Sequence, residues 1–281
     1  YWDVREKRIY RLSSISALVG RRDYKIWNDS DQRVIFKNVV FDPMGKYDEN
    51  EYVNLYDGID VPKIEGIQYE DCGPILEHVF WMCGKDKEVY YWLLKWIAYP
   101  LQNPGAKMQT SIINYGIEGT GKSFLWESIV KKMYGKYGIT VGQAQLESSF
   151  TTWKSHKLFV VAEEVVNRSE KAHYKGQLKH MVTGDSHIIN EKGLPEREED
   201  NLMNFVFLSN NTQPLDLDYG DRRYLVLYMG EVMAREYYER LGNWVEDGGI
   251  EKFYSWLTSI NLENFSPHEK PPMTEAKSDL I

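Results

Sequence analysis

One glycine-rich segment constrains the fold of this 281-residue chain more than any other feature. It matches the phosphate-binding pattern G-x-x-x-x-G-K-S/T, and its residues are Gly116, Ile117, Glu118, Gly119, Thr120, Gly121, Lys122 and Ser123. In such a loop, glycines let backbone N–H groups converge on the β-phosphate, the lysine reaches the β- and γ-phosphate oxygens, and the serine hydroxyl ligates Mg²⁺. A β-prone stretch precedes the loop, and apolar residues at helical spacing follow it. The sequence therefore predicts a site for a nucleoside triphosphate, expected to be ATP with Mg²⁺.

The region around this loop alternates apolar strands with helices, which is typical of a parallel α/β sheet. The predicted strands are 110–115, 158–162, 203–208 and 224–228, and the predicted helices are 122–134, 142–150, 169–182, 232–246 and 253–260. The fold class expected from this pattern is α/β, with a P-loop NTPase core built on a parallel sheet.

Composition changes along the chain predict four regions. Residues 1–70 are turn-rich with short β-prone stretches such as Arg33–Phe36, so a β-rich collar or linker is expected. Residues 71–105 predict a small helical subdomain, and 106–260 predict the ATPase core. Residues 261–281 are polar and contain prolines, which favours a loosely ordered tail.

The acidic balance limits the classes of partner. The net charge is −8 and the sequence pI is about 5.4, which argues against a membrane surface and against broad coverage of duplex DNA. A narrow DNA-binding site in the central hole of a ring of subunits is compatible with this net charge. No long apolar run or signal peptide is visible, so a cytoplasmic location is expected. The chain begins at Tyr1, which suggests a piece of a longer protein, and Cys72 and Cys83 are expected to be buried thiols.

Two carboxylates follow the apolar run at 158–162. Glu163 and Glu164 stand where the Walker B acids of a P-loop ATPase stand. Glu163 is the candidate Mg²⁺ residue, and Glu164 is the candidate base that polarises the attacking water. The alternative is a solvated acidic turn after a buried strand.

Further polar residues follow the next predicted strands. Asn210 ends the strand at 203–208 and could orient the attacking water, although a strand that ends in an Asn turn is common. Arg222 and Arg223 precede the strand at 224–228 and are candidate arginine fingers for the nucleotide of a neighbouring subunit. The alternative is a structural ion pair with Asp221.

Residues between these strands predict a hairpin with Lys192 at its tip. A lysine on a protruding turn suits a contact with the backbone of single-stranded DNA, whereas a solvated turn lysine is the plainer alternative. His187 and Lys179 are the reserve candidates for this contact.

The order of these motifs resembles superfamily 3 helicases, and more closely the helicase domains joined to phage primases and primase–polymerases. The length and character suit the C-terminal part of a deep-sea vent phage primase–polymerase. The resemblance covers roughly residues 70–280, and it rests on Gly119–Ser123, Leu178-Lys179, Glu191–Gly193, Ser209–Asn211, Asp221–Tyr224 and Pro271–Lys277.

The resemblance implies an AAA+-like fold, a homo-oligomer expected to be a hexamer, ATP sites between subunits, and translocation on single-stranded DNA. It also implies an N-terminal primase or polymerase portion in the same polypeptide. One departure is Glu163, because relatives often carry Asp there, which puts the metal geometry in doubt. The leading hypothesis is an ATP-driven DNA helicase. The alternative is an ATPase that assembles or loads a replication complex, and Asn210 with Asp221–Arg223 disfavours a small-molecule kinase.

Overall fold

The computed structural model describes residues 2–3, 8–10, 12–164, 171–215 and 217–281. It divides into two compact units, Tyr1–Gly58 and Ile59–Ile281. The N-terminal unit contains the antiparallel pair β1 (Trp2–Asp3) and β2 (Arg8–Ile9), the helices α1 (Leu12–Val19) and α2 (Arg21–Asn28), and the parallel pair β3 (Asn38–Val40) and β4 (Tyr52–Asn54).

The N-terminal unit is less β-rich than its sequence predicts. Gly20, at φ +85°, separates the two helices α1 and α2, which the turn-rich composition conceals. Arg33–Phe36 is not a strand. Val34 and Ile35 of this stretch are exposed, and they line a cavity of about 920 Å³ together with residues such as Trp27 and Val39.

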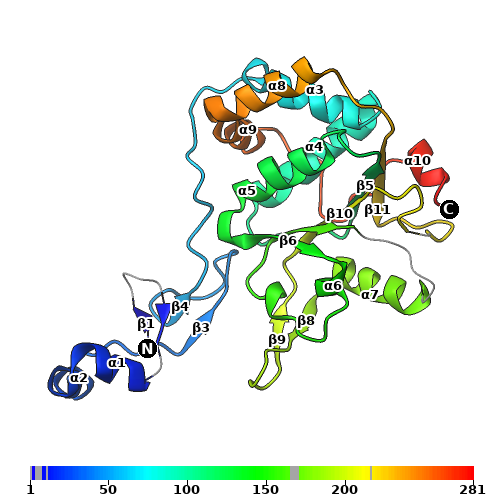
Figure 1. Cartoon of the computed structure of the whole chain (residues 1–281). Coiled ribbons are helices and arrows are strands. Elements are labelled where there is room, and N and C mark those ends of the chain that lie inside the picture. Colours follow the sequence, from blue (N-terminus) through cyan, green and yellow to red (C-terminus); the bar gives the residue numbers. More distant parts are fainter. Residues whose placement is uncertain (1, 4–7, 11, 165–170, 216) are drawn as a thin grey trace. The chain divides into compact units, whose positions relative to one another are not determined.

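A five-stranded parallel sheet forms the centre of the second unit (Figure 1). Its strands lie in the order β11-β5-β10-β7-β6, which is 5-1-4-3-2 when these five strands are numbered along the chain. Their bounds are β5 (Ser111–Gly116), β6 (Gly138–Gly142), β7 (Phe159–Glu163), β10 (Asn204–Ser209) and β11 (Tyr224–Met229). Four of the five were predicted. The fifth, β6, was missed because it has glycine at both ends and only one fully buried residue, so it lacks the continuous apolar run of the other four.

Alternating side chains of the sheet pack into two separate layers. On one face, Val160 and Phe207 join a core cluster with Leu178 and Val182 of α7 (Lys171–Thr183) and with Leu146 of α6 (Gln143–Leu146). On the other face, the π-helical η2 (Phe124–Val130) and α5 (Lys131–Met133) follow the phosphate loop. Trp126 of η2 stacks on Phe159 at 6.5 Å between ring centroids. Burial of the strands on both faces explains why they are almost continuously apolar.

The segment 71–105, expected from the sequence to be helical, contains helices but lies within the second compact unit. It contains α3 (Gly73–Met82) and α4 (Lys87–Gln102), which Gly84 and Lys85 separate with positive φ angles. The Asp86 side chain caps α4 by accepting N–H hydrogen bonds from Glu88 and Val89. Helix α3 packs against η1 (Tyr69–Cys72) and α8 (Arg235–Trp244), and α4 packs against α9 (Ile250–Leu257). The segment η5 (Val245–Gly249) contacts α8 and α9. The two thiols, Cys72 and Cys83, are free and buried as predicted.

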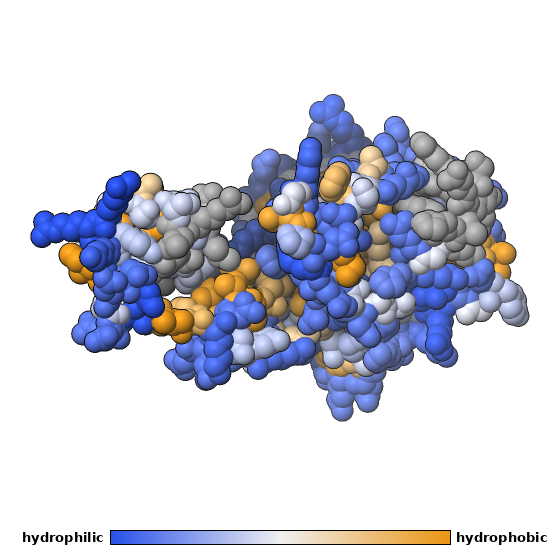
Figure 2. Space-filling view, turned by 90° about the horizontal axis from the view of Figure 1, so that it is seen from below, coloured by the Kyte–Doolittle hydropathy of each residue, from blue (hydrophilic) through white to orange (hydrophobic). Residues whose placement is uncertain are grey.

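The C-terminal segment is not the loose tail that its polar composition suggests. Helix α10 (Glu275–Ser278) packs against β11 (Figure 1). The Thr274 hydroxyl donates to the Val226 carbonyl at 2.7 Å, and the buried Lys277 ammonium donates to the Tyr224 carbonyl at 2.8 Å. Leu280 is part of the core cluster. A few specific contacts order this segment, and composition alone does not reveal them. Much of the surface visible in Figure 2 is hydrophilic.

Candidate functional site

The phosphate loop begins where β5 ends, at the carboxyl edge of the sheet. Gly116 has φ +137°, and a Cβ added there would lie 2.0 Å from the carbonyl oxygen of Met229. Gly121 has φ +87°, and a Cβ there would lie 2.7 Å from Cε1 of His78. Both positions therefore require glycine, for conformation and for space.

The Lys122 side chain is folded along the loop. Its ammonium donates to the carbonyls of Gly116 at 2.9 Å and Ile117 at 2.5 Å, and it lies 3.3 Å from Oγ1 of Thr120. Burial lowers the pKa of Lys122, and the nearby Glu118 carboxylate opposes that shift. Because the ammonium already lies within its own loop, a side-chain movement alone would bring it to the phosphate oxygens of a bound nucleotide. Ser123 is exposed at the start of the following helix.

Glu163 ends β7 at the same edge of the sheet. Its carboxyl group is hydrogen-bonded to that of Glu127, which projects from η2. This hydrogen bond, burial, and the negative charges of Glu127 and Glu164 raise the pKa of Glu163 to about 7, and Lys131 opposes them. Glu127 also accepts a hydrogen bond from the Thr140 hydroxyl at 2.9 Å. Two carboxyl groups from adjacent elements therefore face each other beside the phosphate loop.

Glu164 has an unusual backbone conformation. Its φ is +54°, in the left-handed region that costs a non-glycine residue free energy. Its side chain is exposed at the end of the strand. Residues held in such conformations are found at active sites, where the surrounding structure stabilises them. The segment 165–170, which follows it, lies outside the described residues.

Asn210 lies directly after β10, the strand between β5 and β7. Its side-chain amide donates to Oε1 of Glu118 in the phosphate loop at 3.4 Å. The structure thus brings the loop, Glu163, Glu164 and Asn210 to one edge of the sheet. This is the arrangement expected from the sequence, because parallel strands all end at the same edge.

Arg222 and Arg223 lie at the opposite edge, where β11 begins. Ser111, the first residue of β5, donates its N–H to the Arg223 carbonyl at 2.8 Å. Since β5 has six residues, roughly 20 Å of strand separates this position from the phosphate loop of the same chain. Arg223 is also ion-paired with Asp221, the alternative that its sequence context left open. Neither arginine reaches its own phosphate loop.

The predicted lysine-tipped hairpin is present. It consists of β8 (Ser186–Ile189) and β9 (Arg197–Asp200), which pair antiparallel. At its tip, Leu194 donates its N–H to the Glu191 carbonyl at 3.0 Å and Gly193 has φ +80°, so Lys192 is exposed at the first corner of a tight turn.

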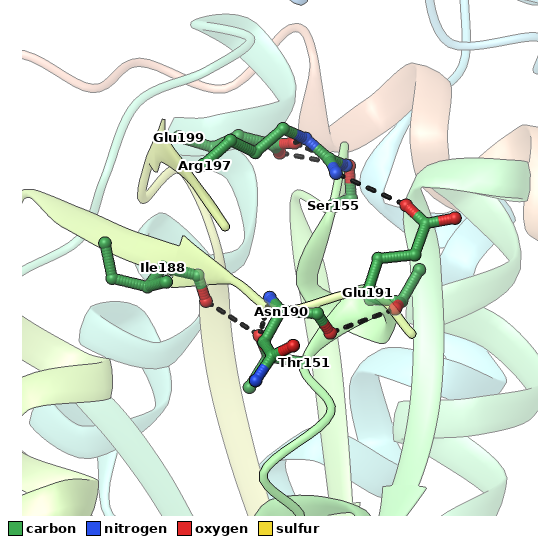
Figure 3. Close-up of polar contacts among 8 residues, drawn as sticks. Thr151, Ser155, Ile188, Asn190, Glu191, Arg197 and Glu199 are labelled. Atoms are coloured by element: carbon green, nitrogen blue, oxygen red, sulfur yellow. Dashed lines mark hydrogen bonds and ion pairs between the residues drawn. The ribbon is translucent and has the colours of Figure 1, made fainter. Parts of the chain in front are cut away.

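A polar network fastens this hairpin to residues 151–155 (Figure 3). The Thr151 hydroxyl donates to the Ile188 carbonyl at 2.7 Å and accepts from the Asn190 N–H at 2.8 Å. Arg197 forms ion pairs with Glu191 at 3.3 Å and Glu199 at 2.9 Å, and it contacts Ser155. The anchored segment leads directly into β7, so the hairpin and the strand that carries Glu163 are connected through a few residues.

His187 and Lys179, the two reserve candidates for the DNA contact, are less accessible than Lys192. His187 is only 8% exposed, and burial is the main cause that lowers its pKa to about 4. Neither of its ring nitrogens has a hydrogen-bond partner within the described part of the chain. The Lys179 ammonium is paired with the Asp218 carboxylate at 2.6 Å. Lys192 is the most exposed of the three candidates.

The structure adds two residues that the sequence did not single out. His78 of α3 is fully buried, with Nδ1 3.0 Å from the Tyr237 hydroxyl and Nε2 3.2 Å from the Gly121 carbonyl. It therefore contacts the backbone of the phosphate loop from helix α3. Glu127 is the second addition, because its position after the loop puts it opposite Glu163. Neither residue belongs to a sequence motif. The one signal that could have pointed to Glu127 is a glutamate on the helix that follows a phosphate loop.

The donor set at this edge suits Mg²⁺ and a triphosphate. A serine hydroxyl and carboxylate oxygens are hard ligands of the kind Mg²⁺ prefers, and these sites keep several waters as ligands. Ser123 and Glu163 would hold the ion, with Lys122 and the loop N–H groups holding the phosphates. Bound Mg²⁺ would neutralise charge on the phosphate oxygens.

A parallel sheet in the order 5-1-4-3-2, with a phosphate loop after its first strand and paired carboxylates after its third, defines an AAA+-like P-loop NTPase fold. The chain is homologous to the DNA primase-polymerase of Nitratiruptor phage NrS-1, with 27% identity over 245 residues. This match covers 82% of the chain but only 32% of the relative, so the chain spans about a third of that protein. The predicted resemblance to phage primase–polymerases is confirmed.

Two further comparisons agree with this relationship. A family of unknown function, DUF5906, matches residues 114–223, which run from the strand before the phosphate loop to Arg223. The apo structure of the NrS-1 C-terminal region has a TM-score of 0.75 at 23% identity, covering 95% of this chain and 65% of that one. An A-form apo structure of the same region has a TM-score of 0.72 with 96% coverage of this chain. The fold is thus shared with that region.

Within the described residues, none of the helices combines the length and the apolar character that crossing a bilayer requires.

Proposed function

We propose that this chain is an ATP-hydrolysing ring helicase that moves along single-stranded DNA during phage DNA replication. The observation that carries the proposal is the meeting of Lys122, Glu163, Glu164 and Asn210 at one edge of the sheet, around the phosphate loop. Homology to a phage primase-polymerase supports the replication context.

The roles follow from this geometry. Lys122 and the loop N–H groups bind the triphosphate, and Ser123 and Glu163 hold Mg²⁺. Glu164, on the strained turn after β7, accepts a proton from the attacking water, and the Asn210 amide orients that water. The exposed Lys192 contacts the DNA backbone within the ring. A primase or polymerase portion of the same polypeptide would use the exposed strand.

The test is ATP hydrolysis by the purified chain, with and without single-stranded DNA. We expect DNA-stimulated turnover that Lys122→Ala lowers by at least roughly 100-fold, because the ammonium stabilises charge on the transferring phosphoryl group. An exposed lysine outside the site, Lys87, provides the matched control Lys87→Ala, which should leave turnover unchanged. Equal turnover in the wild type and Lys122→Ala would refute the proposal.

A second candidate function is an ATPase that loads or assembles a replication complex with little unwinding. The net charge of −8 favours it, because a strand-tracking surface is usually basic. Strand displacement on forked DNA separates the two. ATP turnover with no displaced strand, at a protein concentration that supports oligomers, would favour the loader.

A further inference from the structure

One imidazole contacts the phosphate loop from outside the loop's own motif. His78 of α3 is fully buried, and its Nε2 lies 3.2 Å from the carbonyl oxygen of Gly121. Its Nδ1 lies 3.0 Å from the hydroxyl of Tyr237, which belongs to α8. Three residues from separate elements therefore form one line of hydrogen bonds that ends on the backbone of the loop.

The chemistry of these three groups fixes which atom donates each hydrogen bond. A carbonyl oxygen only accepts, so the Nε2 of His78 must carry a proton and donate to Gly121. Burial lowers the pKa of His78 to about 4, so the ring is neutral at neutral pH and its Nδ1 carries no proton. The Tyr237 hydroxyl must then donate to Nδ1. The contact with Tyr237 thus selects the tautomer of His78 that holds the Gly121 carbonyl.

Neighbouring side chains hold the phenol of Tyr237 in turn. The rings of His78 and Tyr237 lie 5.9 Å apart between centroids, and the Arg240 guanidinium lies 5.7 Å from the centre of the Tyr237 ring. Arg240 of α8 also forms an ion pair with Glu77, the residue before His78 on α3. Helices α3 and α8 are therefore joined at the position where His78 contacts the loop.

The carbonyl that His78 contacts shares a peptide unit with the N–H of Lys122. A trans peptide is planar, and its C=O and N–H bonds point in opposite directions. Leu125 also donates its N–H to the Gly121 carbonyl, at 3.3 Å, so two donors hold this oxygen on one side. Lys122 begins the helical segment that leads into η2, and the N–H groups of a first helical turn have no partner within the helix. The Lys122 N–H therefore faces away from His78, in the direction from which a helix N-terminus binds phosphate.

Glycine at position 121 gives this contact its importance. Because Gly121 has no Cβ, the adjoining peptide planes can rotate, and a rotated Gly121–Lys122 peptide would turn its N–H away from a phosphate. The φ angle of Gly121 is +87°, and a Cβ there would lie 2.7 Å from Cε1 of His78, so the ring lies directly against the glycine. The imidazole thus limits a rotation that the loop sequence itself permits.

We propose that His78 is a positioning residue for phosphate binding, and that Tyr237 holds it in the required tautomer. By holding the Gly121 carbonyl, His78 keeps the Lys122 N–H directed at the β-phosphate of the bound nucleotide. This role rests on the proposed function and adds to its site two residues that lie outside the phosphate-loop motif.

The test is the affinity of the purified chain for ADP with Mg²⁺, measured by calorimetry. His78→Leu removes the donor and should weaken ADP binding roughly tenfold, because a hydrogen bond to a charged phosphate group is lost. His78→Gln keeps an N–H donor and should bind ADP almost as tightly as the wild type. The matched control is Val79→Ala, since Val79 is buried on the same helix. It should lower the urea midpoint and leave the ADP affinity unchanged.

Three outcomes would overturn the role of His78. The first is wild-type ADP affinity in His78→Leu, and the second is ADP binding by His78→Gln as weak as that of His78→Leu. The third is an equal loss of ADP affinity in His78→Leu and Val79→Ala, which would show that His78 only stabilises the fold.

A second variant decides the question if His78→Leu does not fold. Tyr237→Phe removes the hydroxyl that donates to Nδ1 and keeps the ring. It should weaken ADP binding about threefold and raise the KM for ATP with little change in kcat, because the contact is the same in the ground state and the transition state. Unchanged ADP affinity in Tyr237→Phe would refute the line of hydrogen bonds as a positioning device.

The ADP titration also separates this role from the proposed function. A wild type that binds ADP but does not hydrolyse ATP would refute the ATPase, and the ADP affinities of the variants would still decide the role of His78. A wild type that binds no ADP would refute the nucleotide site itself.

Discussion

The carboxyl groups of Glu163 and Glu127 are hydrogen-bonded to each other beside the phosphate loop, which raises the pKa of Glu163 to about 7. Glu163 is delivered by β7 and Glu127 by η2, on the helix that follows the loop. This hydrogen bond therefore links η2 to β7 at the position where Mg²⁺ would bind. The metal prefers an ionised carboxylate, so protons and Mg²⁺ compete for Glu163.

Glu127→Gln should move the acid limb of the Mg²⁺-dependent ATPase profile to lower pH. The substitution removes a negative charge that favours the protonated form of Glu163, and the new amide can donate to the ionised form. Below the wild-type pKa of about 7, the variant should keep Glu163 ionised and retain more activity. Turnover measured across pH at fixed Mg²⁺ checks this. Thr140→Val removes the hydroxyl that donates to Glu127 but keeps its carboxyl group, so it should not move the limb to lower pH. An unchanged limb in Glu127→Gln would contradict the coupling.

Glu164→Gly should stabilise the protein while lowering its activity. Glycine adopts φ +54° without strain, so the free energy of unfolding should rise by roughly 0.5–1 kcal/mol. Turnover should fall by about 100-fold, because the base is lost. Denaturant melts and ATPase assays measure the two effects. At Glu147, where φ is −86°, the control Glu147→Gly should destabilise the protein instead. Unreduced turnover in Glu164→Gly would remove Glu164 from the catalytic role.

Lys192→Ala should weaken binding to single-stranded DNA for all sequences and flatten its salt dependence. The ammonium lies at the exposed tip of the β8–β9 hairpin, and each lost phosphate contact reduces the salt slope by roughly one. Basal ATPase should persist, because the hairpin tip is not part of the phosphate loop. DNA-stimulated ATPase should decrease. Fluorescence anisotropy at several salt concentrations measures the change, with the exposed Lys132 changed to Ala as control. Wild-type binding by Lys192→Ala at every salt concentration would exclude the hairpin contact.

The burial of His78 should make the protein less stable in acid. Burial lowers the pKa of His78 from its ordinary 6.5 to about 4. Between these values the unfolded chain binds a proton that the folded chain does not, so stability is lost as pH falls from 6.5 towards 4. His187 contributes in the same direction. His78→Gln should reduce the difference between urea midpoints at about pH 7 and about pH 5. An equal difference in the variant would show that His78 does not cause this acid sensitivity.

Several parts of the fold could be predicted because they depend on local pattern. The strands β5, β7, β10 and β11 are buried on both faces of the sheet, so each one is an almost uninterrupted apolar run in the sequence. The phosphate loop is set by its glycine positions. The helices α1 and α2 and the packing of α10 were not predicted, because their positions depend on a few contacts that composition does not encode.

By itself, the sequence determined the phosphate loop, the carboxylates at the end of β7 and the Asn after β10, because these depend on residue type and on the shared edge of parallel strands. Only the tertiary structure decided that Glu127 faces Glu163, that His78 contacts the Gly121 carbonyl, and that Lys277 after β11 donates to the Tyr224 carbonyl of that strand. Residues far apart in the chain form these contacts. Their spacing in the sequence carries no periodic signal, so packing alone brings them together.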